Sequence, residues 1–282
     1  MFIVVALLIL VGIILIWFHI PYSPVKKEFQ NDFATLKVKN QVSVTNEIFT
    51  KEDFSHLPTT IQAFLENCGY LGTVKMSYMK MTYKDVEFKQ GKNKPSLIID
   101  YTQYNFIADP SRIALINSSM FTIPFEGYDY YQNGRGGMKG VLAKAITLFD
   151  QTGTDMDKGS LATFLAESLF APTILLQKYI DFEEISNFEV QATINNGGQT
   201  ATGIFTFNER YEMISFTTKD RAVIGPDGTT QYIPWSALCG DYQFAENGIK
   251  YPTKFQAVWN YSDGDFIYFN GKINEISYGF TE

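Results

Sequence analysis

The residue most suggestive of chemistry in this sequence is Glu167, a lone carboxylate in the apolar segment LATFLAESLFAPTILL at residues 161–176. Ser160, Thr163 and Glu167 recur at intervals of three and four, so a helix places them on one narrow polar stripe beside an apolar face. Pro172 ends or kinks that helix and leaves Glu167 in its last turn. Because the helix dipole disfavours an anion there by ~0.3–1 kcal/mol, we expect Glu167 to lie beside a cation.

Four arginines could supply that cation, since a planar guanidinium is the usual bidentate partner of a partly buried carboxylate. They are Arg112, Arg135, Arg210 and Arg221. Arg221, at the end of a strand pattern in SFTTKDRAV, is the preferred partner. We expect Glu167 to form a structural ion pair with it rather than to contact a ligand. Further binding or ion-pair candidates are Asp129, Asp241 and Trp235.

Most catalytic classes lack their residues in this chain, and no catalytic residue is assigned. The two histidines, His19 and His56, have no evident Ser or Cys nucleophile nearby, and no G-x-S-x-G motif occurs. Two cysteines and two histidines at these separations match no zinc-ligand spacing, so neither a metal nor a cofactor is expected. A carboxylate-dependent hydrolase is the less favoured alternative, because Glu167 could meet Asp129 or Asp241 in space.

Helical patterns occur around this stripe and in one earlier segment. In SHLPTTIQAFLENCG, apolar residues recur at helical spacing. The stretch DQTGTDMDKGS is expected to be a loop, with Asp157 or Ser160 capping a helix that begins near Leu161. After Pro172, the segment PTILLQKYI could start a second short helix.

Strand patterns fill most of the remaining chain. β-Branched and aromatic residues dominate residues 72–149 and the residues after 181, which predicts about five strands before the helical insert and about six after it. The turns INNGGQ, GPDGTT, AENGIK and SDGDF place Asn-Gly or Asp-Gly between apolar runs, which indicates hairpins between antiparallel neighbours. The sequence therefore predicts an α+β fold: a large curved antiparallel sheet, a half-barrel of about 10–12 strands, with the helical insert packed on it.

Two local patterns refine the description of this sheet. Apolar residues occupy both parities around residues 74–83, so the strand there either bulges or has both faces covered. The glycine-rich stretch NGRGGMKG at residues 133–140 lacks the spacing of a phosphate-binding P-loop. We interpret it as a tight turn with a close backbone approach.

The first eighteen residues contain no charged side chain and are long enough to cross the ~30 Å hydrocarbon core of a bilayer. Trp17, Phe18 and Tyr22 lie where an interfacial aromatic belt would fall. The segment has no positive n-region and no small-residue cleavage site, so we interpret it as an uncleaved single-pass anchor that contacts the membrane through residues 2–18. The predicted organisation is an anchor at 1–20, a membrane-proximal linker at 21–52 with room for one short strand, and a single α+β domain at 53–282.

The charge pattern restricts the partners and leaves the orientation of the anchor open. A net charge of −7, with no basic tract longer than Lys26-Lys27, argues against nucleic acid. Lysines after the apolar segment favour a cytoplasmic domain, whereas the acids interleaved with them weaken that bias. Cys68 and Cys239 could form one bridge at most, and two buried thiols are favoured.

The segment LAESLFAP resembles the LAE-x-x-W/F-x-P signature of a bacterial family of domains of unknown function. LPTTIQAFLENCG, FEGYDYYQNGRGGMKG and YIPWSALCGDYQFAENGIKYP resemble further parts of that family in order, over residues 55–280. This chain departs from the pattern where Ala162-Thr163 replaces Arg-Tyr and Phe170-Ala171 replaces Trp-Phe. The resemblance implies no activity, substrate or cofactor. The fold it implies is similar to the curved half-barrel of lipoprotein carriers in the LolA and LppX group, which favours an extracytoplasmic location.

These features favour a membrane-anchored, non-enzymatic module that binds an apolar ligand, such as a lipid, between the sheet and the helical insert. Met76, Met79 and Met81 suit such a pocket, because the methionine side chain is flexible and adaptable. The alternative is a structural or assembly factor at the cell envelope, which would bind partners through a sheet edge and hold no ligand. The sequence indicates no particular protein partner.

Overall fold

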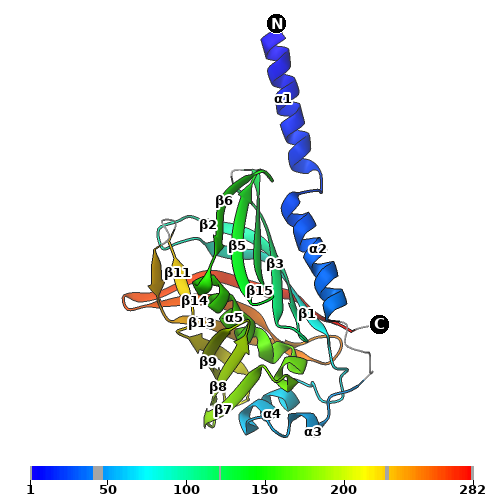
Figure 1. Ribbon diagram of the computed structural model, residues 1–282, viewed down its shortest axis with the longest axis vertical. Helices are drawn as coiled ribbons and strands as arrows, with labels where there is room; N and C mark the ends of the chain where they lie inside the picture. The colour runs from blue at the N-terminus through cyan, green and yellow to red at the C-terminus, as the bar shows by residue number, and fades with distance from the viewer. Residues whose placement is uncertain (1, 41–46, 121, 226–228, 281–282) are drawn as a thin grey trace.

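The computed structural model describes residues 2–40, 47–120, 122–225 and 229–280 (Figure 1). Helix α1 (Phe2–His19) projects from a body built around one large antiparallel sheet. Thirteen strands form that sheet in the order β6-β5-β4-β3-β2-β1-β15-β14-β13-β10-β9-β8-β7, so it is open, with β6 and β7 at its edges. The predicted α+β class with a large antiparallel sheet is confirmed, and the sheet has one strand more than the expected upper number.

The sheet has two meandering halves that join where β1 pairs with β15. The first half comprises β1 (Tyr78–Lys89), β2 (Ser96–Phe106), β3 (Ser111–Met120), β4 (Ile123–Gln132), β5 (Arg135–Leu142) and β6 (Ile146–Thr152). The second comprises β7 (Ile180–Ser186), β8 (Glu189–Asn196), β9 (Gln199–Phe207), β10 (Met213–Thr218), β13 (Trp235–Phe244), β14 (Lys250–Tyr261) and β15 (Gly264–Gly279). A separate ribbon pairs β11 (Ala222–Ile224) with β12 (Thr230–Tyr232).

Three of the four predicted glycine turns connect neighbouring strands of the sheet. Gly197, Gly248 and Gly264 all have positive φ, in the turns β8–β9, β13–β14 and β14–β15. The tip of the fourth, GPDGTT, falls at 226–228 and lies outside the described residues. The glycines in these turns, which adopt positive φ easily, therefore determine where these hairpins form.

Helix α5 (Thr154–Glu167) lies across the sheet and packs on β5 in one half and on β9 in the other (Figure 1). It begins at Thr154 rather than near Leu161, so the expected loop is in fact the end of β6 and the start of α5. Neither Asp157 nor Ser160 caps it, because the cap position is Gly153. Asp157 lies in the first turn, where the helix dipole favours an acid, and accepts a hydrogen bond from the Gly136 N–H at 2.8 Å.

The end of α5 agrees with the prediction from Pro172. The helix stops at Glu167, and two short 3-10 helices follow, η1 (Ser168–Phe170) and η2 (Pro172–Leu176). The predicted apolar face is fully buried; its members are Leu161, Phe164, Leu165 and Leu169. The insert is thus held in the core by this face.

The glycine-rich stretch at residues 133–140 is a tight turn followed by a strand, as predicted. A Cβ on Gly136 would come within 2.5 Å of the Ser160 Oγ, so only glycine lets β5 lie directly against α5. A Cβ on Gly134 would lie 2.6 Å from the Cα of Gly197, so the β4–β5 and β8–β9 turns touch. The two halves of the sheet therefore curve around α5 until these turns meet.

Residues 24–39, assigned to the linker from the sequence, form helix α2 (Pro24–Lys39), which Ser23 caps at its N-terminus. Val25, Phe29 and Leu36 of α2 are buried in a second core on the outer side of the sheet. The sheet residues of this core are Phe106, Ile113, Tyr128 and Val141. The apolar residues on both faces of the strand around residues 74–83 have both of the expected causes. Helices cover both faces of the sheet there, and β1 bulges, since its register with β2 shifts between Tyr83 and Val86.

Helix α1 is long and apolar enough to cross a membrane, and none of its apolar stretch is buried against the body. Its C-terminal end is nevertheless held by the β5–β6 turn. Trp17 Nε1 donates a hydrogen bond to the Ala143 carbonyl at 2.9 Å. Lys144, only 3% exposed, donates to the carbonyls of Trp17 and Ile20 at 3.0 and 2.6 Å. These four residues, the α1 clasp below, join the apolar helix to the sheet.

Two small helices, α3 (Lys51–Phe54) and α4 (Thr59–Asn67), pack at the end of the body that lies away from α1 (Figure 1). The helix predicted in SHLPTTIQAFLENCG is therefore confirmed. Cys68, which caps α4, and Cys239 are both free thiols. Burial raises the pKa of Cys68 to about 12, so this thiol is unreactive near neutral pH.

Candidate functional site

A cavity of about 140 Å³ lies between α5 and the sheet. Its walls are mainly aromatic side chains from β1, β2, β14 and β15: Tyr83, Tyr101, Phe255, Tyr268 and Phe269. Met138 and Met156 add flexible apolar surface, whereas Met76, Met79 and Met81, expected in such a pocket, do not line it and are buried in the core. Apolar walls with a few convergent polar groups are the composition of a small-molecule site.

The polar stripe of α5 faces this cavity. Ser160, Thr163 and Glu167, grouped from their spacing in the sequence, all line it. The Thr163 hydroxyl donates to the Gly159 carbonyl at 2.9 Å, within the helix. The stripe therefore supplies the polar groups of an internal site and not a solvated helix face.

Glu167 is held by Arg112 at one end of the cavity, so the expected pairing with Arg221 is wrong. Arg112 donates from Nε and Nη2 to the two carboxylate oxygens at 3.0 and 3.3 Å. Asn105 Nδ2 donates to the same carboxylate at 2.8 Å. The reason is geometric: β3 carries Arg112 past the C-terminal end of α5, whereas Arg221 lies beside Gly159, two turns earlier on the helix.

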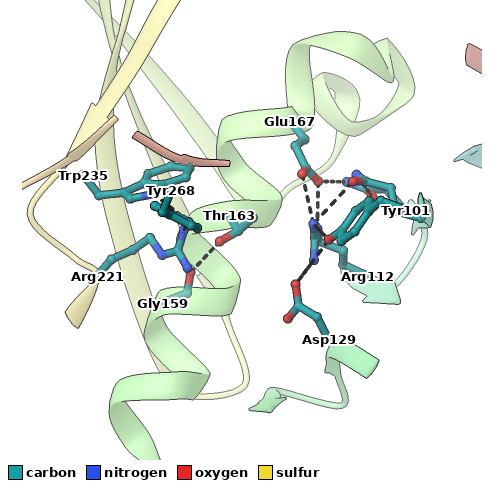
Figure 2. A network of polar contacts seen from close by, with 11 residues as sticks. Tyr101, Arg112, Asp129, Gly159, Thr163, Glu167, Arg221, Trp235 and Tyr268 are labelled. Carbon is teal, nitrogen blue, oxygen red and sulfur yellow. Dashed lines mark hydrogen bonds and ion pairs between the residues drawn. The ribbon is translucent and has the colours of Figure 1, made fainter. Parts of the chain in front are cut away.

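Arg112 also binds Asp129, so two carboxylates share one guanidinium (Figure 2). Its Nη1 donates to Asp129 Oδ2 at 2.7 Å, and its Nη2 donates to the Tyr101 hydroxyl at 2.7 Å. Burial acts to lower the pKa of Arg112, but the charges of Glu167 and Asp129 outweigh it and hold that pKa well above its usual value. This end of the cavity therefore holds two carboxyl groups in direct contact with one guanidinium.

Arg221 lies on the opposite side of Thr163, among aromatic rings (Figure 2). The centre of its guanidinium is 4.4 Å from the ring centroid of Trp235 and 5.5 Å from that of Trp259. Its Nη1 donates to the Tyr268 hydroxyl at 3.2 Å, and Trp235 Nε1 donates to that same hydroxyl at 3.0 Å. Arg221 is thus positioned by cation–π stacking, whereas Arg112 is positioned by ion pairs.

Of the other candidate residues, the structure brings Asp129 and Trp235 to the cavity and leaves Asp241 outside it. Asp241 is exposed on β13 with a φ of +55°, and its carbonyl accepts a hydrogen bond from Thr253. Arg112 was one of four candidate partners of Glu167 in the sequence but not the preferred one, and Tyr101 and Tyr268 were not predicted as members of the site. The shortage of arginine was a usable signal for Arg112, whereas nothing distinguished these two tyrosines from the other fifteen.

Comparison with known proteins places this chain in a family. Residues 47–271 match a family of unknown function, DUF6544. The chain belongs to that family. The predicted membership of a family of unknown function is therefore confirmed. The comparison with curated proteins gives no match.

Two solved structures resemble this DUF6544 chain at low similarity. One is a domain assigned as an outer membrane lipoprotein-sorting protein from Vibrio parahaemolyticus, with 10% identity, a TM-score of 0.39, and coverage of 72% of this chain and 84% of its own. The other is a DUF1329 family protein from Desulfovibrio piger, with 10% identity, a TM-score of 0.42, and coverage of 82% and 94%. Similarity this low supports no conclusion about this chain.

The geometry gives little support to the carboxylate-dependent hydrolase in this DUF6544 protein. Both oxygens of Glu167 accept hydrogen bonds from the Arg112 guanidinium, so neither is free to contact a substrate. Asp129 is bound to the same guanidinium. A glycosidase-type pair flanks an open space for the substrate bond, whereas here both acids are bound to the same guanidinium of Arg112.

Proposed function

We propose that this protein is a membrane-anchored, non-enzymatic module that binds a small apolar or amphiphilic molecule, such as one end of a lipid, between α5 and the sheet. The cavity is the observation that carries the proposal. Its volume of about 140 Å³ is close to that of an engineered cavity of roughly 150 Å³ that binds benzene. A whole lipid would need a larger space, since pockets for drug-sized ligands measure roughly 300–1,000 Å³.

The anchoring part of the proposal rests on α1 and on how it joins the body. The helix is long and apolar enough to cross a bilayer. Trp17 donates to Ala143, and α2 continues from α1 onto the outer face of the sheet, so the binding domain would sit directly at the membrane surface. A cavity held there is well placed to exchange an amphiphile with the bilayer. The geometry favours neither side of the membrane, although the lipoprotein-carrier resemblance points to the outside.

The main alternative is an assembly factor that binds a protein through a sheet edge. The edge strand β6 exposes Ile146 and Leu148, and unpaired edge strands are ready sites for strand addition. This alternative needs no cavity, so variants that fill the cavity separate the two proposals.

The test uses the full-length chain in nanodiscs of neutral phospholipid and the neutral amphiphile hexanamide, which is small enough for the cavity. We expect binding with a Kd on the order of 1 mM or tighter, seen by ligand-observed NMR and as an increase in Tm. The variant Ala257→Phe places a large ring in the cavity, because Ala257 lines it on β14. This variant is expected to lose binding.

The matched control is Gln256→Phe, whose side chain lies on the opposite face of the same strand and should leave binding unchanged. Thr163→Leu fills the cavity from α5 and serves as a second variant should Ala257→Phe fail to fold. Equal hexanamide binding by wild type and by both folded filling variants would overturn the proposal, as would no binding by the wild type.

A further inference from the structure

Arg221 has no carboxylate partner among the described residues, in contrast to Arg112. All ion pairs within 4.0 Å in this part of the chain involve other groups: Asp220 binds Lys158, and Asp157 binds Arg135. The Nε of Arg221 is buried and has no hydrogen-bond partner within the described ranges. Leaving a charged donor buried and unpaired is costly, so this edge of the guanidinium is ready to accept an anion.

The Tyr268 hydroxyl beside Arg221 provides a second donor. It accepts hydrogen bonds from Arg221 Nη1 and from Trp235 Nε1, which use both acceptor positions of a hydroxyl. Its own proton has no acceptor within the described part of the chain. Both Arg221 and Tyr268 line the cavity. An anion at this point would therefore meet a guanidinium edge and a phenolic O–H together.

The acids of the cavity leave the charge of Arg221 uncompensated. Glu167 and Asp129 are bound to Arg112, and Glu167 lies eight residues, or about 12 Å, along the helix from Gly159 at the Arg221 end. Asp155 lines the cavity on the Arg221 side, accepts a hydrogen bond from the Tyr232 hydroxyl at 2.8 Å and makes no ion pair with Arg221 within 4.0 Å. The positive charge of Arg221 therefore has no carboxylate within 4.0 Å among the described residues, and one monovalent anion would balance it.

We propose that Arg221 and Tyr268 bind the carboxylate of an amphiphilic carboxylic acid, whose hydrocarbon part lies along the aromatic wall of the cavity. The inference rests on the proposed function and names its ligand class. A planar carboxylate matches the donor fork of a guanidinium, and its single charge matches the single unpaired cation. A phosphate dianion would add two negative charges to a cavity already lined by Asp155, Asp129 and Glu167.

Hexanoate and hexanamide, which differ mainly in charge, test the proposal with the full-length chain in neutral nanodiscs. Isothermal titration should show that the wild type binds hexanoate at least tenfold more tightly than hexanamide. Arg221→Met keeps most of the side-chain volume and should reduce this preference to about one. Gly159→Ala is a milder variant, because its Cβ would lie at an ordinary contact distance of 3.8 Å from Arg221 Nε, and it should reduce the preference several-fold.

Arg210→Met is the matched control, since Arg210 pairs with Glu212 away from the cavity and its loss should leave the preference unchanged. The proposal is overturned if the wild type binds both probes equally, if Arg221→Met keeps the preference, or if hexyl phosphate binds more tightly than hexanoate. Hexanamide binding without a hexanoate preference removes only this inference and leaves the proposed function in place. Failure of both probes to bind removes both.

Discussion

At the scale of single residues, the two arginines that line the cavity, Arg112 and Arg221, are stabilised in different ways. Arg112 is 5% exposed and directs its donors to Glu167, Asp129 and Tyr101. Arg221 stacks on Trp235 and keeps one donor unpaired. A buried charge is tolerated when it is paired, so Arg112 braces α5 against β3 and β4. Arg221 lacks such a partner among the described residues, which is why we assign it to a ligand.

Replacing Glu167 by glutamine should destabilise the domain by about 1–3 kcal/mol, because Arg112 then keeps only Asp129 as an ionised partner. Urea unfolding followed by circular dichroism measures this as a lower midpoint. Glu183→Gln, an exposed acid on β7, is the control and should leave the midpoint unchanged. An unaltered midpoint in Glu167→Gln would show that the pair contributes no net stability.

A second residue-scale prediction concerns Glu212, whose carboxylate lies 2.6 Å from Lys250 Nζ. Burial acts to raise the pKa of Glu212, but the hydrogen bonds from Lys250 and Asn208 outweigh it and hold the pKa below 4.5. A lowered pKa in the folded state means that the stabilisation is present above 4.5 and is lost as the pH falls through the folded value.

Glu212→Gln should therefore lower the urea midpoint at neutral pH, and its difference from wild type should shrink as the pH falls below 4.5. Midpoints measured across this range test the prediction. A difference that stays constant as the pH falls from 4.5 to the point of acid unfolding would contradict it, because the carboxylate would then make no pH-dependent contribution.

At the scale of elements, the close approach of β5 to α5 decides the shape of the site. Gly136 allows this approach, since a Cβ there would meet both the Met156 carbonyl and Ser160 Oγ, the latter at 2.5 Å. The tight contact at Gly136 involves Ser160, a member of the polar stripe of α5 that lines the cavity, so it fixes how this face of the helix lies against the sheet.

Gly136→Ala should destabilise the protein by about 1–3 kcal/mol, because the added methyl forces α5 away from β5. It should also weaken hexanamide binding, since the cavity walls move apart. Gly240→Ala is the matched control: Gly240 also lies in a strand, and a Cβ there meets nothing within 4 Å. Thermal unfolding compares the two variants, and equal shifts in Tm would contradict the close-packing argument.

At the scale of the whole molecule, helices α1 and α2 would hold the binding domain against the bilayer. The lysines and acids of α2 contribute to this docking, because Lys26 pairs with Glu126 and Glu28 pairs with Lys139 on the sheet. These charged side chains of α2 therefore help to hold the helix on the outer face of the sheet. If α1 spans the membrane as proposed, the α1 clasp would place the β5–β6 turn at the membrane surface.

A fluorophore attached at Ile146→Cys, beside the α1 clasp, should be quenched by shallow spin-labelled lipids in nanodiscs. The same label at Glu183→Cys, on the opposite edge strand, should not be quenched. The native thiols should react slowly, because burial raises the pKa of both Cys68 and Cys239. Adding Lys144→Met, which removes two hydrogen bonds of the α1 clasp, should reduce quenching at position 146. Equal quenching of the labels at positions 146 and 183 would show that the β5–β6 turn does not lie at the membrane surface.

The sequence by itself determined the parts of this protein that depend on neighbours along the chain. Turn residues such as Gly197 and Gly248 specified hairpins, because only a few residue types adopt positive φ easily. The apolar face of α5 and its end before Pro172 followed from helical periodicity. The length and charge pattern of the N-terminal segment likewise predicted α1. Each of these features is encoded within a few residues.

The tertiary structure alone decided which distant residues meet. Glu167 required a cation, but only the path of β3 made that cation Arg112, 55 residues away in sequence, and left Arg221 with aromatic neighbours. The start of α5 at Thr154 and the docking of α2 also depended on packing against the sheet. Side-chain chemistry states which partners a residue needs, whereas strand order and sheet curvature decide which candidate comes within contact distance.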